Sequence, residues 1–247
     1  MGSDDINKRK IVKNREMRQA RKLGRKTQSR TSIPRILILT EGLTEEIYFK
    51  SLKKNLKLNS VEVLKSPYTD SNGIIKDAKN RGTKSVDNHD EYNYIFCVFD
   101  LDTVKDKQFL PSIESYNAKY EKSNSTIYPI LTFPCIEFWF ILHYSCHSAP
   151  FSTSRNRSVG ENTKVEFKKY QGNYHETNYE CIGDLASKYK TALHNAKVLM
   201  TQQVNCSSSN PLTNIHQLVM LLHNIYSRTQ DYQYQKDLDT FILNNVN

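Results

Sequence analysis

The chain lacks any long apolar run, and this absence excludes a membrane-spanning helix. Crossing a bilayer takes about 18–20 consecutive apolar residues, and no stretch of the 247 residues approaches that length. The N-terminus also lacks the apolar segment of a signal peptide and is charged instead. With 38% hydrophobic and 25% charged residues, the composition is typical of a soluble globular protein, which we expect to be cytoplasmic and to make no membrane contact.

Cysteines are few and follow no disulfide pattern. There are five, scattered along the chain, and no two of them form a C-x-x-C pair. Cys97 and Cys135 lie in apolar surroundings, which is typical of small buried thiols in a reducing compartment. The sequence HYSCH at 143–147 could contribute zinc ligands, but a fourth ligand at suitable spacing is missing. The alternative is a helix end with incidental polar residues.

Positive charge is concentrated at one end of the chain. Residues 1–34 carry eleven Lys and Arg against three acids, a net charge of +8, whereas the whole chain carries +9. Clustered positive charge is typical of proteins that bind phosphate backbones; a solvated arm without a dedicated ligand is the alternative. The arm has no sustained apolar stripe, so we expect it to be disordered or helical only on contact. Its candidate nucleic-acid-binding residues are Arg15, Arg18, Arg21, Lys22, Arg25 and Lys26.

Short apolar runs then alternate with amphipathic segments. Strands are expected at residues 35–40, 60–64, 94–99 and 126–131. A helix capped by Thr44 should follow the first strand, and a helix over 74–81 should end at Gly82. A third helix is marked by Phe109, Ile113, Tyr116 and Tyr120. This alternation predicts an α/β fold with a mostly parallel, four-stranded sheet flanked by crossover helices.

The C-terminal part reads as a helical elaboration of this core. Residues 145–180 are polar and irregular, with basic and aromatic residues interleaved. This mixture favours phosphate contacts and base stacking on RNA or single strands, although a long loop would have a similar composition. The candidate nucleic-acid-binding residues there are Arg155, Arg157, Lys168 and Lys169. Helices are expected over 184–200 and from Asn210-Pro211 onward. We expect three parts: the arm 1–34, the core 35–145, and the region 146–247 packing on the core.

Acidic residues follow directly after two of the expected strands. Asp100 and Asp102 end YIFCVFDLD, and Glu41 follows ILILT. Alternate strand residues share a face, and ligands of open α/β sheets bind beyond the carboxyl ends of the strands. We therefore expect these three carboxylates to converge on Mg²⁺ or Mn²⁺. Glu41 would serve as general acid/base, and the metal pair would activate a phosphodiester.

Two other interpretations of these acids remain open. VFDLDT could be the nucleophilic motif of a haloacid-dehalogenase-like phosphatase, with Asp100 attacking phosphorus. That family has Gly and Thr after the second Asp, whereas Thr103 and Val104 stand here. Alternatively, the acids could cap or pair structurally. Glu137 poses a similar choice, because an acid in the apolar run CIEFWFILHY either caps a helix or adds a third acid to the metal site.

The order of strand–Glu-Gly and strand–Asp-x-Asp resembles the Toprim fold of topoisomerases, primases and OLD-type nucleases. More narrowly, four segments resemble the RloB-like family, which includes AbiLii-like abortive-infection proteins: ILILTEGLTEEIYFKSLKK, YIFCVFDLDT, TFPCIEFWFILHY and SNPLTNIHQLV. The chain departs from the family pattern at Phe133, where many relatives have Asn, and at Leu101, where a polar or basic residue is common. Neither departure removes an acid.

This resemblance implies a nuclease-like component of bacterial antiphage defence, commonly encoded beside an ATPase partner. It assigns acid/base and metal roles to Glu41, Asp100 and Asp102, and it adds Glu45 and Glu137 as candidate metal ligands. RNA, including tRNA, is the preferred substrate over DNA because of the basic arm and the aromatic–basic segment. The competing hypothesis is a nucleic-acid-binding or sensor subunit without catalysis, in which the acids are inert.

Overall fold

The computed structural model describes residues 33–88, 90–102, 104, 109–121, 125–206 and 209–227. From Pro34 onward the described residues belong to one compact unit. The six arm residues predicted to bind nucleic acid lie outside the described residues, so that prediction stays open. None of the described helices is long and apolar enough to cross a bilayer.

The centre of the unit is a five-stranded sheet in the order β2-β1-β3-β4-β5. Its strands are β1 (Ile36–Thr40), β2 (Val61–Lys65), β3 (Tyr94–Asp100), β4 (Thr126–Phe133) and β5 (Leu212–Thr213). The first four pair in parallel, and β5 pairs antiparallel to β4. The predicted α/β class and mostly parallel sheet are confirmed, with a fifth strand that the prediction of four did not include.

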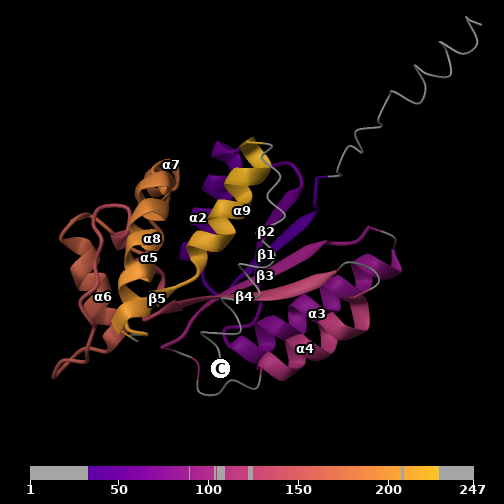
Figure 1. Ribbon diagram of the computed structural model, residues 1–247, viewed down its shortest axis with the longest axis horizontal. Coiled ribbons are helices and arrows are strands. Elements are labelled where there is room, and N and C mark those ends of the chain that lie inside the picture. The colour runs from indigo at the N-terminus through magenta and orange to yellow at the C-terminus, as the bar shows by residue number, and fades with distance from the viewer. Residues whose placement is uncertain are drawn as a thin grey trace, which may run out of the picture. The chain divides into compact units, whose positions relative to one another are not determined.

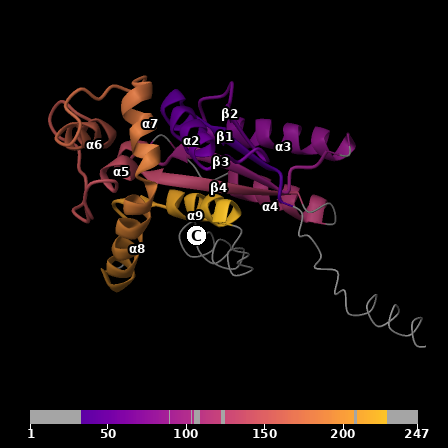
Figure 2. The same cartoon turned by 90° about the horizontal axis from the view of Figure 1, so that it is seen from above.

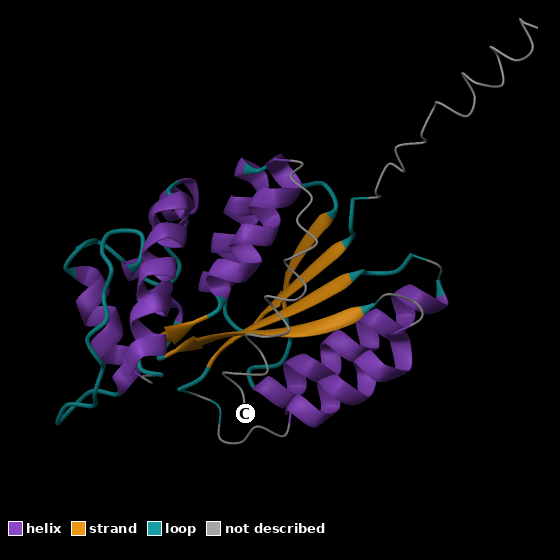
Figure 3. Cartoon of the chain, in the orientation of Figure 1, coloured by secondary structure: helices purple, strands orange, loops and turns teal. Residues whose placement is uncertain are grey.

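Helices cover both faces of the sheet, as Figures 1 and 3 show. Leu37 and Leu39 of β1 point to α3 (Ser71–Asp87) and α4 (Phe109–Tyr120). Ile36 and Ile38 point to the opposite face. The helices whose buried residues join the core on that face are α2 (Leu43–Asn55), α5 (Ile136–Ile141), α6 (Val159–Lys168), α7 (Tyr179–Ser187), α8 (Tyr189–Cys206) and α9 (Ile215–Ser227). Strand β1, apolar from Ile36 to Leu39, is therefore buried on both faces, as expected for a parallel sheet.

The C-terminal helices lie against one another and against the end of the sheet from which α5 leaves (Figure 2). Within them, α7 packs on α2, α6 on α5, and α9 on α8 and β4. Asn214 joins the last helix to the sheet, because its side-chain amide donates to Pro129 O (3.1 Å) and its carbonyl accepts from Leu131 N (2.6 Å). These bonds complete the edge of β4 where the two-residue β5 is too short to do so.

Several local predictions were wrong. Thr44 does not cap α2, which begins at Leu43 after Gly42 without a side-chain cap; its hydroxyl donates instead to Glu176 O. Gly82 does not end α3 but lies inside it, where a Cβ atom would stand 2.1 Å from the Tyr116 hydroxyl of α4. Glycine is therefore required by close helix packing rather than by a helix end.

Two other boundaries also differ. The predicted helix over 184–200 is two helices, α7 and α8. Asn210-Pro211 does not start α9, because β5 intervenes and the Asn210 side chain exchanges hydrogen bonds with the backbone of Phe151.

Candidate active site

The site is built first from the carboxyl ends of two neighbouring strands. Glu41 follows β1, and its backbone N–H donates to Val98 O of β3 (3.0 Å). Asp100 is the last residue of β3, and its N–H donates to Glu41 Oε2 (3.3 Å). The Glu41 side chain is thus held across the end of β3, so the two predicted acids lie at the same edge of the sheet.

Two further acids come from the first turns of helices. Glu45 lies in the first turn of α2 and Glu137 in the first turn of α5. A carboxylate is favoured there by the helix dipole. Both are nearly inaccessible, with exposed fractions of 5% and 1%, and each has one buried oxygen, Oε2, without a hydrogen-bond partner among the described residues. Helix capping alone leaves those two oxygens unexplained, since buried polar atoms are almost always paired.

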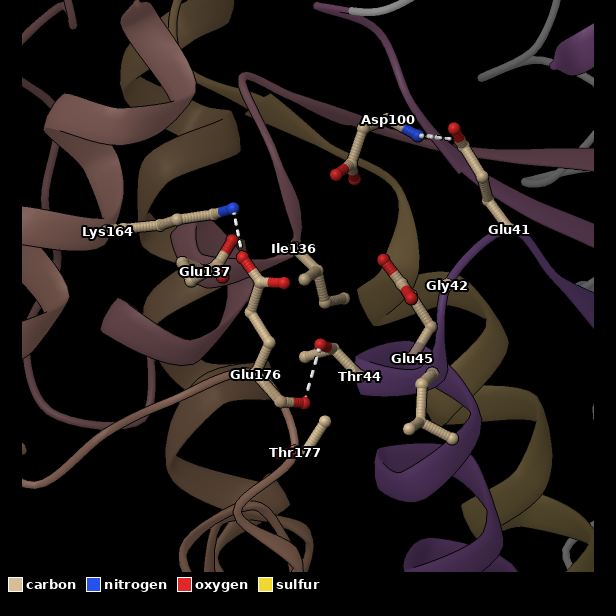
Figure 4. A pocket seen from close by; sticks show the side chains of 11 residues that line it. Glu41, Gly42, Thr44, Glu45, Asp100, Ile136, Glu137, Lys164, Glu176 and Thr177 are labelled. Carbon is tan, nitrogen blue, oxygen red and sulfur yellow. Dashed lines mark hydrogen bonds and ion pairs between the residues drawn. The ribbon is translucent and has the colours of Figure 1, made fainter. Parts of the chain in front are cut away.

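These four acids line one pocket of about 210 Å³ (Figure 4). The remaining lining comes from the start of α2 and α5, from α6, and from the segment that leads to α7: Gly42, Leu43, Thr44, Ile136, Lys164, Glu176 and Thr177. Residues far apart in the sequence therefore share one concave site at the carboxyl edge of the sheet, where ligands of open α/β sheets bind.

The segment between α6 and α7 closes one side of this pocket. The Tyr174 hydroxyl donates to Glu137 Oε1 (2.7 Å), and the Thr44 hydroxyl donates to Glu176 O (2.9 Å). Lys164 forms an ion pair with Glu176. These contacts fix the segment to both acid-bearing helices.

The carboxylates perturb one another strongly. Burial raises the pKa of Glu45 to about 7, and the charges of Glu137 and Glu41 add to the effect. Burial also raises the pKa of Asp100 well above its usual range, reinforced by Glu45, Glu137 and Glu41. The pKa of Glu41 is raised by burial, although the hydrogen bond from Asp100 opposes this. Such a cluster is strained when fully ionised, and a cation would relieve it.

Lys164 is held in the charged form. Burial by itself lowers its pKa, but the hydrogen bond to Glu176 and the charge of Glu137 raise the pKa overall. The pocket thus contains a permanent positive charge facing the acids.

Asp102 occupies a different place from the one predicted. Strand β3 ends at Asp100, so the strand alternation does not extend to Asp102, which is exposed and does not line the pocket. Its Oδ2 lies beside Gly160 in the first turn of α6, where an added Cβ would be 2.6 Å away. Its charge still contributes to the raised pKa values of Glu41 and Asp100.

The other predicted site residues lie outside this pocket. Arg155, Arg157, Lys168 and Lys169 are all exposed, and Lys169 pairs with Glu166. His143 of the HYSCH sequence is buried, with its ring bonded to Trp139 O and the Tyr48 hydroxyl.

Sequence reasoning did not assign Lys164, Tyr174 or Glu176 to the site. The capping box of Ser158 and Glu161 was a readable signal for the start of α6, and hence for Lys164 on a helix. Nothing comparable marks Tyr174 or Glu176.

The residues present fit a hard divalent cation by their chemistry. Five carboxylates line the pocket, and two of their oxygens, one in Glu45 and one in Glu137, are buried without a partner among the described residues; oxygen donors of this kind are what Mg²⁺ and Mn²⁺ prefer. Over the part of the chain that the structure describes, no three His, Cys, Asp or Glu side chains are yet spaced so as to hold a metal ion. Binding would therefore draw the carboxylates closer together.

The fold and site define an α/β protein with an acidic pocket at the carboxyl edge of a mostly parallel sheet. The model of the RloB-like protein family matches residues 36–222, and the chain belongs to this family. The match spans every element from β1 to most of α9, including all the acids of the pocket. No curated protein and no solved structure matches the chain.

Proposed function

We propose that this RloB-like protein is a metal-dependent nuclease that cleaves a nucleic-acid phosphodiester. The observation that carries the proposal is the acidic pocket itself. Glu41 and Asp100 meet at adjacent strand ends, and the buried Glu45 and Glu137, each with one unpartnered oxygen, line the same pocket. A Glu directly after the first strand and an Asp-x-Asp that begins at the last residue of the third support a Toprim-like assignment of this core.

In this proposal a water oxygen bonds to phosphorus while the bond from phosphorus to the leaving oxygen breaks. Glu41 takes the proton of the water, a role suited to a carboxylate whose pKa is raised by burial. The leaving oxygen gains a proton from solvent. A bound Mg²⁺ or Mn²⁺ supplies the Lewis acid that polarises the phosphodiester and neutralises the developing charge. Asp100, Glu45 and Glu137 would hold that ion, and Asp102, which lies beside Gly160 outside the pocket, would act through its charge on Glu41 and Asp100.

RNA is the substrate that we favour, through the basic arm of residues 1–34 and the exposed basic residues around α6. A role in antiphage defence together with an ATPase partner goes with the family resemblance and belongs to the same proposal.

The test is cleavage of end-labelled RNA and DNA by the full-length protein with Mg²⁺ or Mn²⁺. Glu41→Gln and Asp100→Asn should each lower the cleavage rate by about 10²-fold or more. Glu46→Gln is the matched control, because Glu46 lies in the first turn of α2 beside Glu45 but pairs with Lys50 outside the pocket. If both site variants cut as fast as the wild type, the assignment is wrong.

Deletion of residues 1–34 separates the nuclease from the non-catalytic binding subunit. A nuclease retains metal-dependent cleavage by residues 35–247, at reduced affinity and with a weaker salt dependence. A subunit that only binds nucleic acid shows no cleavage, and its binding is lost when the arm is deleted. A phosphatase of the haloacid-dehalogenase type would instead turn over small phosphomonoesters and trap a phosphoryl group on Asp100.

A further inference from the structure

The pocket poses an electrostatic problem for any phosphodiester. Five carboxylates line it, including Glu176, and they repel an anionic substrate. Of the described residues that line the pocket, Lys164 carries the one basic side chain. Its ammonium group faces the acids across the pocket in Figure 4.

The position of Lys164 is set by a well-anchored helix. The reciprocal capping box of Ser158 and Glu161 fixes the start of α6. Thr163 and Phe167, one residue before Lys164 and three after it, are fully buried. The helix is thereby held against the core while Lys164 projects into the pocket.

The present partner of Lys164 is replaceable. The Lys164 side chain is 37% exposed and that of Glu176 is 58% exposed. An ion pair at such exposure contributes only about 0–1 kcal/mol. A phosphate oxygen, which is a comparable acceptor, can therefore take the place of the Glu176 carboxylate at little cost.

We propose that Lys164 binds a non-bridging oxygen of the substrate phosphate, and that Glu176 occupies this phosphate-binding position when no substrate is present. This inference rests on the proposed nuclease function and adds to it the group that holds the scissile phosphate opposite the acids. Glu176 then competes with the substrate for Lys164.

The test compares kinetic constants of cleavage by the full-length protein with Mg²⁺. Lys164→Met should lower kcat/KM by about 10- to 100-fold, as expected for loss of a hydrogen bond to a charged group. Lys50→Met is the matched control, because Lys50 also pairs with a glutamate, Glu46, but does not line the pocket. It should change kcat/KM by less than about twofold. Lys164→Arg should retain most of the activity.

Glu176→Gln distinguishes phosphate binding by Lys164 from a purely structural role of the Lys164–Glu176 ion pair. Both Lys164→Met and Glu176→Gln break the pair, so a structural role predicts that they impair the protein alike. Our proposal predicts opposite effects, with Glu176→Gln lowering KM because the competing carboxylate is gone. Equal impairment by the two variants, or a Lys164→Met enzyme as active as Lys50→Met, would overturn the proposal.

A binding measurement distinguishes failure of this inference from failure of the nuclease function. Inorganic phosphate is titrated calorimetrically into wild type and Lys164→Met in Mg²⁺. Phosphate should bind the wild type more tightly than it binds Lys164→Met, and it should bind Glu176→Gln more tightly than the wild type. If the wild type cuts no RNA or DNA, the nuclease function fails while this binding series still decides the role of Lys164. Equal phosphate binding by wild type and Lys164→Met refutes the role.

Discussion

Replacing Gly160 by alanine tests whether Asp102 acts from the place where the structure holds it. A Cβ at Gly160 would lie 2.6 Å from Asp102 Oδ2, whereas ordinary contacts begin at 3.4 Å. The carboxylate must therefore move by about 0.8 Å, the difference between these two distances. A misplacement of about 1 Å in a catalytic constellation can lower the rate about 10²-fold.

The same substitution should not weaken the fold. Gly160 lies in the first turn of α6, and alanine favours a helix over glycine by up to about 1 kcal/mol. We therefore expect Gly160→Ala to melt at the wild-type temperature or slightly above it, while its metal-dependent cleavage of labelled RNA falls about 10- to 100-fold.

Gly183→Ala is the control for helix propensity alone. Gly183 lies in α7, and its added Cβ would meet Ser51 Oγ at 3.6 Å, which is an ordinary contact. This variant should cleave like the wild type. If Gly160→Ala also cuts at the wild-type rate, Asp102 has no catalytic role that depends on this position, and our reasoning about it is refuted.

Three further predictions concern stability. Because the pKa of Glu45 is raised from 4.5 to about 7 in the folded chain, its stabilising contribution is complete below pH 4.5 and is lost as the pH rises through 7. Without divalent ions the melting temperature should therefore fall from pH 5 to pH 8, less so in Glu45→Gln; an unchanged slope in the variant would contradict this. Gly82→Ala should destabilise the chain by about 1–3 kcal/mol in urea unfolding, because its Cβ would overlap the Tyr116 hydroxyl. Adding Tyr116→Phe to Gly82→Ala should recover part of that loss. If the two substitutions instead destabilise the chain additively, the contact is excluded. Asn214→Ala should cost about 2–4 kcal/mol by the same measurement, since it leaves two polar groups of β4 without their partners; a loss below about 0.5 kcal/mol would show that these bonds are dispensable.

The sequence predicted the parts of the fold that depend on local pattern. Apolar runs located β1, β3 and β4, and the rule that ligands bind at strand carboxyl ends placed Glu41 near Asp100. Strand alternation failed for Asp102, because the strand ends at Asp100 and the chain then bends. The two-residue β5 was missed because it is too short to show a period.

The missed site residues depend on long-range packing. Tyr174 reaches Glu137 across 37 positions, and Glu176 receives the Thr44 hydroxyl across 132 positions. Neither contact leaves a mark in the local sequence. Gly82 shows the same limit, because a glycine required by a neighbouring helix looks like a glycine at a helix end.

The most direct measurement of the central claim is an anomalous difference map from crystals of the protein grown in Mn²⁺. The account predicts a Mn²⁺ peak in the pocket, coordinated by Asp100 and by at least one of Glu41, Glu45 and Glu137. Mn²⁺ bound only at other places, with these carboxylates left apart or paired with protein groups, would contradict it.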